Sequence, residues 1–125
     1  HNFARLHKAL EGTEDRLILP VACEHSDPSW FGFLITCKEG VDRNKVVQYV
    51  EERGVQTRML FAGNLIKHPC FDEMRKTGEG YRVSGTLENT DRIMADTFWV
   101  GVYPGMTDVM IDYMAKTIRE ALTQA

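Results

Sequence analysis

The sequence has few cysteines, and their spacing excludes the common metal-binding frameworks. Cys23, Cys37 and Cys70 are odd in number and far apart, and no Cys-x-x-Cys pair occurs. Neither a zinc ribbon nor an iron–sulfur ligand set can therefore be built from this chain alone. We interpret all three side chains as free structural thiols in a reducing compartment.

Long apolar runs and an excess of basic residues are also absent. No uninterrupted hydrophobic stretch approaches the roughly 20 residues that a membrane-spanning helix requires. Lys and Arg total 15 against 18 Asp and Glu, a net charge of −3, and both signs are spread along the chain. Because nucleic-acid binding needs clustered cations, we expect neither a membrane nor a nucleic acid as a partner.

The motifs of complete active sites are missing as well. The chain has no Ser-His-Asp order, no Gly-x-Gly-x-x-Gly loop and no His-Glu-x-x-His pair. Its 125 residues suffice for one domain but are few for a complete cofactor enzyme. The first six residues carry neither an initiating Met nor an apolar signal-peptide core, so we expect the chain to begin inside a longer protein.

What the sequence does contain is a mixed pattern of strands and helices. Aromatic and β-branched content predicts strands over residues 17–21, 30–36, 56–61 and 97–103. Two helices are predicted from residue 3 to a stop at Gly12 and from Asp42 to Gly54. One or two helical turns are predicted over residues 69–74, a short helix after a cap at Asn89 or Thr90, and a final helix after Thr107. Because strands and helices do not alternate strictly, we expect an α+β two-layer sandwich, a small and mainly antiparallel sheet with helices on one face.

The stretch from Thr57 to Leu65 offers groups that suit a polar ligand. Arg58 lies on a strand expected to be half exposed, and a guanidinium can hold a phosphate or carboxylate through two hydrogen bonds. A weakly paired surface arginine is the alternative interpretation. Asn64 could orient a sugar hydroxyl or carbonyl, or it could occupy a left-handed turn position. His68 could act as an acid or base near neutrality, although a histidine before a proline is more often a loop residue.

Arg92 and the aromatic strand supply the remaining candidates. Arg92 stands near the start of a short helix, where backbone donors could help it to hold an anion, and an exposed ion pair is the alternative. Phe31 and Phe33 lie in a strand with several aromatic residues. Most of these aromatic side chains are expected in the core, but one face of the strand could line a cleft because side chains alternate across a strand.

At these residues the sequence resembles the C-terminal domain of the DegT-type, vitamin-B6-dependent sugar aminotransferases of fold type I. The resemblance covers essentially the whole chain, through Asn2-Phe3, Leu6, Leu19-Pro20, the aromatic strand, Gly54–Arg58 and Phe98–Pro104. Three blocks are similar to the CDP-4-keto-6-deoxy-D-glucose 3-dehydrase branch of that family: Ser26–Phe33, Arg58–Leu65 and Asn89–Met94.

This resemblance implies that residues 1–125 form a single C-terminal domain of a larger enzyme, with residues 1–12 as the end of a connecting helix. For the dehydrase branch it implies removal of the C-3 hydroxyl of a CDP-4-keto-6-deoxyhexose, a step toward 3,6-dideoxysugars of bacterial lipopolysaccharide and O-antigen. It also implies pyridoxamine 5'-phosphate and a 2Fe-2S cluster bound by a large domain outside this chain, a homodimer, a reductase partner and a cytoplasmic bacterial location. The isolated chain is expected to be inactive.

The resemblance further implies that this domain closes over the active site and contacts the substrate. Carried over to this sequence, the expected contacts are Arg92 and Arg58 for anions or hydroxyls, Asn64 for the sugar, and Phe31 or Phe33 as an apolar wall. Lys67 and His68 depart from the loop expected for a dehydrase, so no role follows for them. A pyridoxal phosphate-dependent nucleotide-sugar aminotransferase and a non-enzymatic binding module are the two alternatives.

Overall fold

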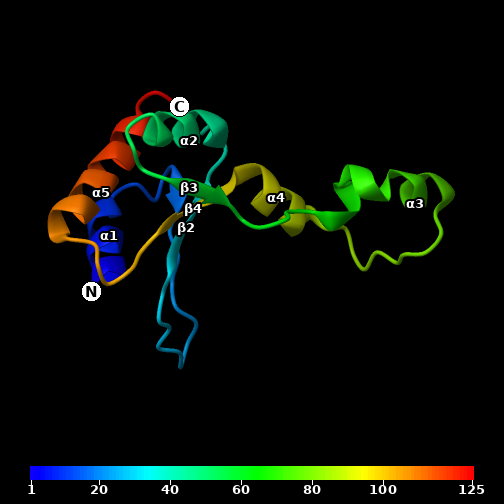
Figure 1. The fold of residues 1–125 in the computed structure, drawn as a ribbon, viewed down its shortest axis with the longest axis horizontal. Coiled ribbons are helices and arrows are strands. Elements are labelled where there is room, and N and C mark those ends of the chain that lie inside the picture. Colours follow the sequence, from blue (N-terminus) through cyan, green and yellow to red (C-terminus); the bar gives the residue numbers. More distant parts are fainter.

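Four short strands form one antiparallel sheet in the computed structural model, which describes residues 1–125 (Figure 1). The strands are β1 (Leu17–Ile18), β2 (Gly32–Cys37), β3 (Thr57–Met59) and β4 (Thr97–Gly101), in the spatial order β1-β2-β4-β3. The central pair, β2 and β4, runs in register from Gly32 opposite Gly101 to Thr36 opposite Thr97. The expected α+β class with a small antiparallel sheet is confirmed.

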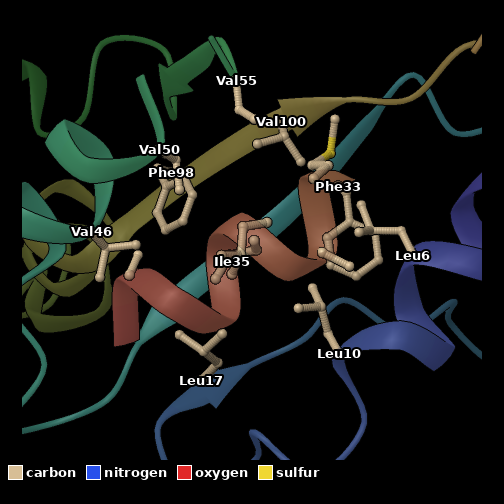
Figure 2. Close-up of a cluster of buried hydrophobic side chains, with 14 of the residues drawn as sticks. Leu6, Leu10, Leu17, Phe33, Ile35, Val46, Val50, Val55, Phe98 and Val100 are labelled. Carbon is tan, nitrogen blue, oxygen red and sulfur yellow. The ribbon is translucent and has the colours of Figure 1, made fainter. Parts of the chain in front are cut away.

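Helices α1 (Asn2–Leu10), α2 (Arg43–Glu51) and α5 (Asp108–Leu122) lie over one face of this sheet, with α5 in contact with both of the others. Side chains from the strands and these helices interlock in a single core, shown in Figure 2. Its fully buried members include Leu6, Leu10, Phe33, Ile35, Val46, Val50, Phe98, Val100, Ile111 and Ile118. Burial of each such side chain stabilises the fold by about 1.5–3 kcal/mol before entropic costs.

The helix starts predicted from capping residues at Asp42 and Thr107 are confirmed. The Asp42 carboxylate accepts hydrogen bonds from the backbone N–H groups of Asn44 (2.9 Å) and Lys45 (3.3 Å) at the start of α2. The Thr107 hydroxyl accepts one from Met110 N at the start of α5. These side chains satisfy donors that a helix start leaves unpaired. Four apolar residues at helical spacing along α5 are all buried: Ile111, Met114, Ile118 and Leu122.

Residues 60–87, which we call the arm, leave the sheet after β3 and return through α4 (Glu88–Asp96) to β4. The arm contains two 3-10 turns, Leu65–Lys67 and Pro69–Phe71, followed by α3 (Asp72–Thr77). Figure 1 shows that the arm extends away from the sheet and the helices that cover it, with α3 at its far end. Only Asn64 among its residues is buried, so the hydrophobic core does not include the arm.

Several predicted boundaries differ from the structure. The first strand ends at Ile18 because Pro20 has no N–H for a sheet ladder. Strand β2 begins only at Gly32, and β4 ends at Gly101. Strand β3 stops at Met59, and Phe61 adopts the left-handed conformation (φ +47°), which cannot continue a strand.

The cap predicted at Asn89 or Thr90 is wrong. Helix α4 begins at Glu88 behind Leu87, which also has a positive φ (+58°) and no capping side chain. No helix of the chain combines the length and the apolar character needed to cross a bilayer.

Candidate functional site

The face of the sheet opposite the core carries an aromatic and cationic row. Side chains alternate along a strand, so Trp99 lies on the opposite face from the buried Phe98 and Val100. The strand register sets Trp99 beside Leu34 of β2 and Arg58 of β3. This row therefore brings together a half-buried indole, a half-buried aliphatic side chain and an exposed guanidinium.

Phe31 extends the row at its aromatic end. Its ring meets the Trp99 ring edge to face, with centroids 5.4 Å apart, and it remains 67% exposed. Gly32 allows this arrangement, because a Cβ at that position would lie 2.8 Å from Trp99 Cε3. The backbone at Gly32 thus lies close against the Trp99 ring. Trp99 Nε1 is buried and has no hydrogen-bond partner in the chain, which leaves a donor unsatisfied on this face.

Arg58 is exposed and bonds only to neutral groups of the two residues before it. Its guanidinium donates to the backbone oxygen of Thr57 (3.0 Å). The amide oxygen of Gln56, in the orientation that satisfies both groups, accepts hydrogen bonds of 2.9 Å from both terminal nitrogens of Arg58. Since these partners are uncharged, the positive charge of Arg58 is available to an anion.

Arg92 is exposed on α4, where the sequence placed it on a short helix. It is the fifth residue of the helix, one position beyond the first four N–H groups that a helix leaves unpaired, so the expected help from backbone donors is not supported by its position. The neighbouring Asp91 does not pair with it. Instead, Asp91 Oδ1 lies 2.7 Å from Lys67 Nζ.

Asn64 is 2% exposed, and both ends of its amide are engaged within the chain. Its Nδ2 donates to Asp91 Oδ1 (2.8 Å), and its Oδ1 accepts from Ile66 N (3.3 Å). Its backbone is extended (φ −87°, ψ 104°), while the preceding Gly63 takes the left-handed position (φ +62°). Asn64 therefore caps the first 3-10 turn of the arm, and the left-handed turn interpretation is wrong.

Phe33 is fully buried in the core, with its ring centroid 4.9 Å from that of Phe3. Because nothing of its surface remains exposed, Phe33 cannot form a wall that a ligand touches. Of the two predicted residues, only Phe31 is exposed enough to do so. Trp99 was not among the residues predicted for the site, although it lies on the sheet face opposite the core. Its alternation with Phe98 was the signal that could have found it.

Lys67 and His68, which depart from the loop expected for a dehydrase, both make contacts at the base of the arm. Lys67 pairs with Asp91, and His68 Nε2 lies 2.5 Å from the backbone oxygen of Ala62. The hydrogen bond from Lys67, helped by that from Asn64, holds the pKa of the Asp91 carboxyl below its ordinary value. The carboxylate is therefore charged and partnered at neutral pH.

The chain holds no cluster of side chains that fits a metal centre, and its two larger hollows lack the side chains that most often hold a phosphate. No group of three or more His, Cys, Asp or Glu side chains is placed to hold a metal ion. Cys37 is buried in the core while Cys23 and Cys70 are exposed, and all three are free thiols. The two larger hollows, of about 490 and 510 Å³, are lined by neither lysine nor arginine, the side chains that most often hold a phosphate.

Comparison with known proteins identifies relatives for nearly the whole chain. A family model described as the DegT/DnrJ/EryC1/StrS aminotransferase family matches residues 1–119. The chain is 46% identical to a dTDP-4-dehydro-2,6-dideoxy-D-glucose 3-dehydratase of Saccharopolyspora spinosa, over 99% of this chain and 26% of that protein. It is 49% identical to the lipopolysaccharide biosynthesis protein RfbH of Salmonella typhimurium, over 95% of this chain and 26% of that protein. The chain thus spans about a quarter of the length of these curated relatives.

Solved structures show the same fold at lower sequence identity. DesI with its TDP-sugar product superposes with a TM-score of 0.79 at 17% identity, over 98% of this chain and 30% of that one. An E. coli GDP-4-keto-6-deoxy-D-mannose-3-dehydratase with bound hydrated PLP gives a TM-score of 0.75 at 22% identity, over 94% and 29% of the two chains. At these identities the likeness concerns the fold alone.

Proposed function

Because the chain belongs to the DegT/DnrJ/EryC1/StrS aminotransferase family, we propose that it is the substrate-covering C-terminal domain of a nucleotide-sugar 3-dehydrase. The observation that carries this proposal is the 46% identity, over 99% of the chain, to a protein named as a sugar 3-dehydratase. The substrate would be a CDP-4-keto-6-deoxyhexose that loses its C-3 hydroxyl. The similarity to RfbH supports a place in lipopolysaccharide biosynthesis of a bacterial cytoplasm.

The geometry suits such a substrate. A nucleotide sugar carries a diphosphate, several hydroxyls and a flat base. The aromatic and cationic row, with the neighbouring arm, offers groups for each kind of contact. Arg58 and Arg92, which have no carboxylate partner, would bind anionic oxygens or hydroxyls. Phe31, backed edge to face by Trp99, would form the apolar wall that excludes water from the reacting sugar.

Direct contact by Phe33 or Asn64 is not part of this proposal. Phe33 belongs to the core, and the amide of Asn64 is already engaged.

The cofactors belong, on this proposal, to the part of the full-length protein outside this chain. Pyridoxamine 5'-phosphate would supply the amine that activates the C-4 ketone, and a 2Fe-2S cluster with a reductase partner would supply electrons. The residues of this chain fit neither group, so no step of the reaction is assigned to them here. A homodimer is proposed on the same family basis, and the isolated chain is expected to be inactive.

The reaction type can be tested on the full-length protein that contains this chain. We would supply pyridoxamine phosphate, a two-electron reducing system and, in turn, CDP-, dTDP- and GDP-4-keto-6-deoxyhexoses. The nucleotide panel is needed because the relatives' names carry dTDP and GDP. The proposal predicts a CDP-sugar product that lacks the C-3 oxygen and forms without an amino donor.

An aminotransferase is the second candidate, favoured by fold neighbours such as TlmJ, a solved aminotransferase with a TM-score of 0.78. A 4-amino sugar formed only when glutamate is present would establish that candidate. Tight binding of the nucleotide sugar without any turnover would establish the binding module instead.

A further inference from the structure

We propose that Lys67, Asp91 and Asn64 form a positioning clamp that locks the base of the arm onto α4 and keeps Arg92 free for an anionic ligand. The inference rests on the proposed function in one respect, that the ligand of Arg92 is a nucleotide sugar. The clamp itself is argued from contacts within this chain.

The clamp centres on one carboxylate oxygen. Asp91 Oδ1 accepts from Lys67 Nζ at 2.7 Å and from Asn64 Nδ2 at 2.8 Å. Asn64 is in turn fixed by Ile66 N, which donates to its side chain, and by Lys67 N, which donates to its backbone oxygen at 3.0 Å. Asn64 is the one buried residue of the arm, so this network is the most enclosed point of the arm.

A second contact one helical turn along α4 holds the same loop. Gly63 packs so closely on Met94 that a Cβ at residue 63 would lie 2.6 Å from Met94 Cγ. Asn64 N also points to Met94 Sδ at 3.4 Å. Because Asp91 and Met94 are three residues apart, they share a face of α4, and the loop is attached along that face.

The arm needs such an attachment because both of its ends are strained. Phe61 at its start and Leu87 at its end have φ values of +47° and +58°. Bulky residues adopt the left-handed region only when surrounding structure imposes it. The clamp lies between Phe61 and Leu87, close to Phe61 in sequence. It supplies the surrounding structure that holds these residues in the left-handed region.

The clamp also controls the charge next to Arg92. An unpaired Asp91 carboxylate would either neutralise the adjacent guanidinium or repel an approaching diphosphate. Lys67 compensates that negative charge, and the shared hydrogen bonds turn Asp91 toward the loop. Lys67 and Asp91 are therefore positioning residues that act through Arg92, and no direct contact with the substrate is assigned to them.

The test uses the full-length protein and the nucleotide sugar that it turns over. Lys67→Met leaves an uncompensated carboxylate beside Arg92, and we expect KM to rise about tenfold, the effect of one unit charge at intermediate distance, with kcat changed less than about twofold. Asp91→Asn keeps the hydrogen-bond acceptor but removes the charge. Adding it to Lys67→Met should therefore bring KM most of the way back to the wild-type value. Lys67→Arg should also preserve KM.

Lys76→Met is the matched control, because Lys76 forms a similar exposed pair with Glu73 (2.6 Å) on α3, at the far end of the arm. It should leave KM unchanged. An equal KM for Lys67→Met and Lys76→Met, or no recovery on adding Asp91→Asn, would overturn the proposed charge control at Arg92.

Amide hydrogen exchange of residues 61–68 in the same protein tests the clamp whether or not the sugar is a substrate. We expect Lys67→Met to accelerate exchange there and Lys76→Met to leave it unchanged. Unchanged exchange in Lys67→Met would overturn the clamp. Accelerated exchange in a protein that turns over no nucleotide sugar would support the clamp and reject the proposed function alone.

Discussion

Different forces stabilise the helix-covered sandwich and the arm. In the sandwich, 19 buried hydrophobic residues form one cluster drawn from strands and helices far apart in sequence. In the arm, a single residue is buried, and order comes from polar contacts such as Lys67 with Asp91 and Arg75 with the backbone oxygen of His68 (2.9 Å). Burial thus fixes the fold, while polar contacts shape the arm next to the candidate site, and the arm can vary without unfolding the rest.

The largest difference between the two regions is expected from truncating an aromatic residue in each. Phe98→Ala leaves a cavity in the centre of the core and should destabilise the 125-residue chain by about 3–5 kcal/mol. Phe71→Ala, at a 36% exposed position of the arm, should cost less than about 1 kcal/mol. Urea unfolding of both variants measures the two values, and similar losses would mean that the arm shares the core.

Thiol reactivity should separate the regions in a second way. Burial raises the pKa of the Cys37 thiol to about 11, so little thiolate forms near neutral pH, whereas Cys23 and Cys70 are exposed. A disulfide reagent at pH 8 should therefore modify two thiols quickly and the third only after denaturant is added. Rapid reaction of all three would show that the sandwich opens readily around Cys37.

Acid pH should affect the two regions through different carboxylates. The bidentate hydrogen bonds of Arg5 lower the pKa of Asp112 between α1 and α5, and Lys67 lowers that of Asp91 at the base of the arm. A lowered folded-state pKa gives stability that is present above the unfolded value near 3.8 and is lost as pH falls through the folded value.

Carboxyl NMR titration should therefore place both midpoints below 3.8. Asp112→Asn should reduce the dependence of the unfolding temperature on acid pH. Asp91→Asn should change the local stability of the arm alone. A midpoint at or above the ordinary value for either group would contradict its contacts.

The difference between the sandwich and the arm also explains which parts of the structure could be predicted from the sequence. The core elements follow from local signals: the Asp42 and Thr107 caps and the spacing of Ile111, Met114 and Ile118 are all contained in short windows. The family resemblance rests on other short blocks, such as Ser26–Phe33 and Phe98–Pro104, so fold and family could both be predicted from local sequence.

The base of the arm could not be predicted in this way. Asn64 finds its partner Asp91 27 residues later, and no local pattern announces that contact. Helix α4 starts behind Leu87 without a capping side chain, because tertiary contacts rather than local capping set that boundary. Trp99 was not predicted as a site residue, since alternation shows that a strand has two faces but not which one the helices cover.

The most direct test of the account is the effect of Arg92→Ala on the full-length protein, with Arg82→Ala, another exposed arginine, as control. We predict that kcat/KM for the nucleotide sugar falls about tenfold or more, as expected for the loss of a charged hydrogen bond to the substrate, while the unfolding temperature stays within about 2 °C. Arg82→Ala should change neither quantity. An unchanged kcat/KM in Arg92→Ala would contradict the claim that this part of the chain covers the substrate.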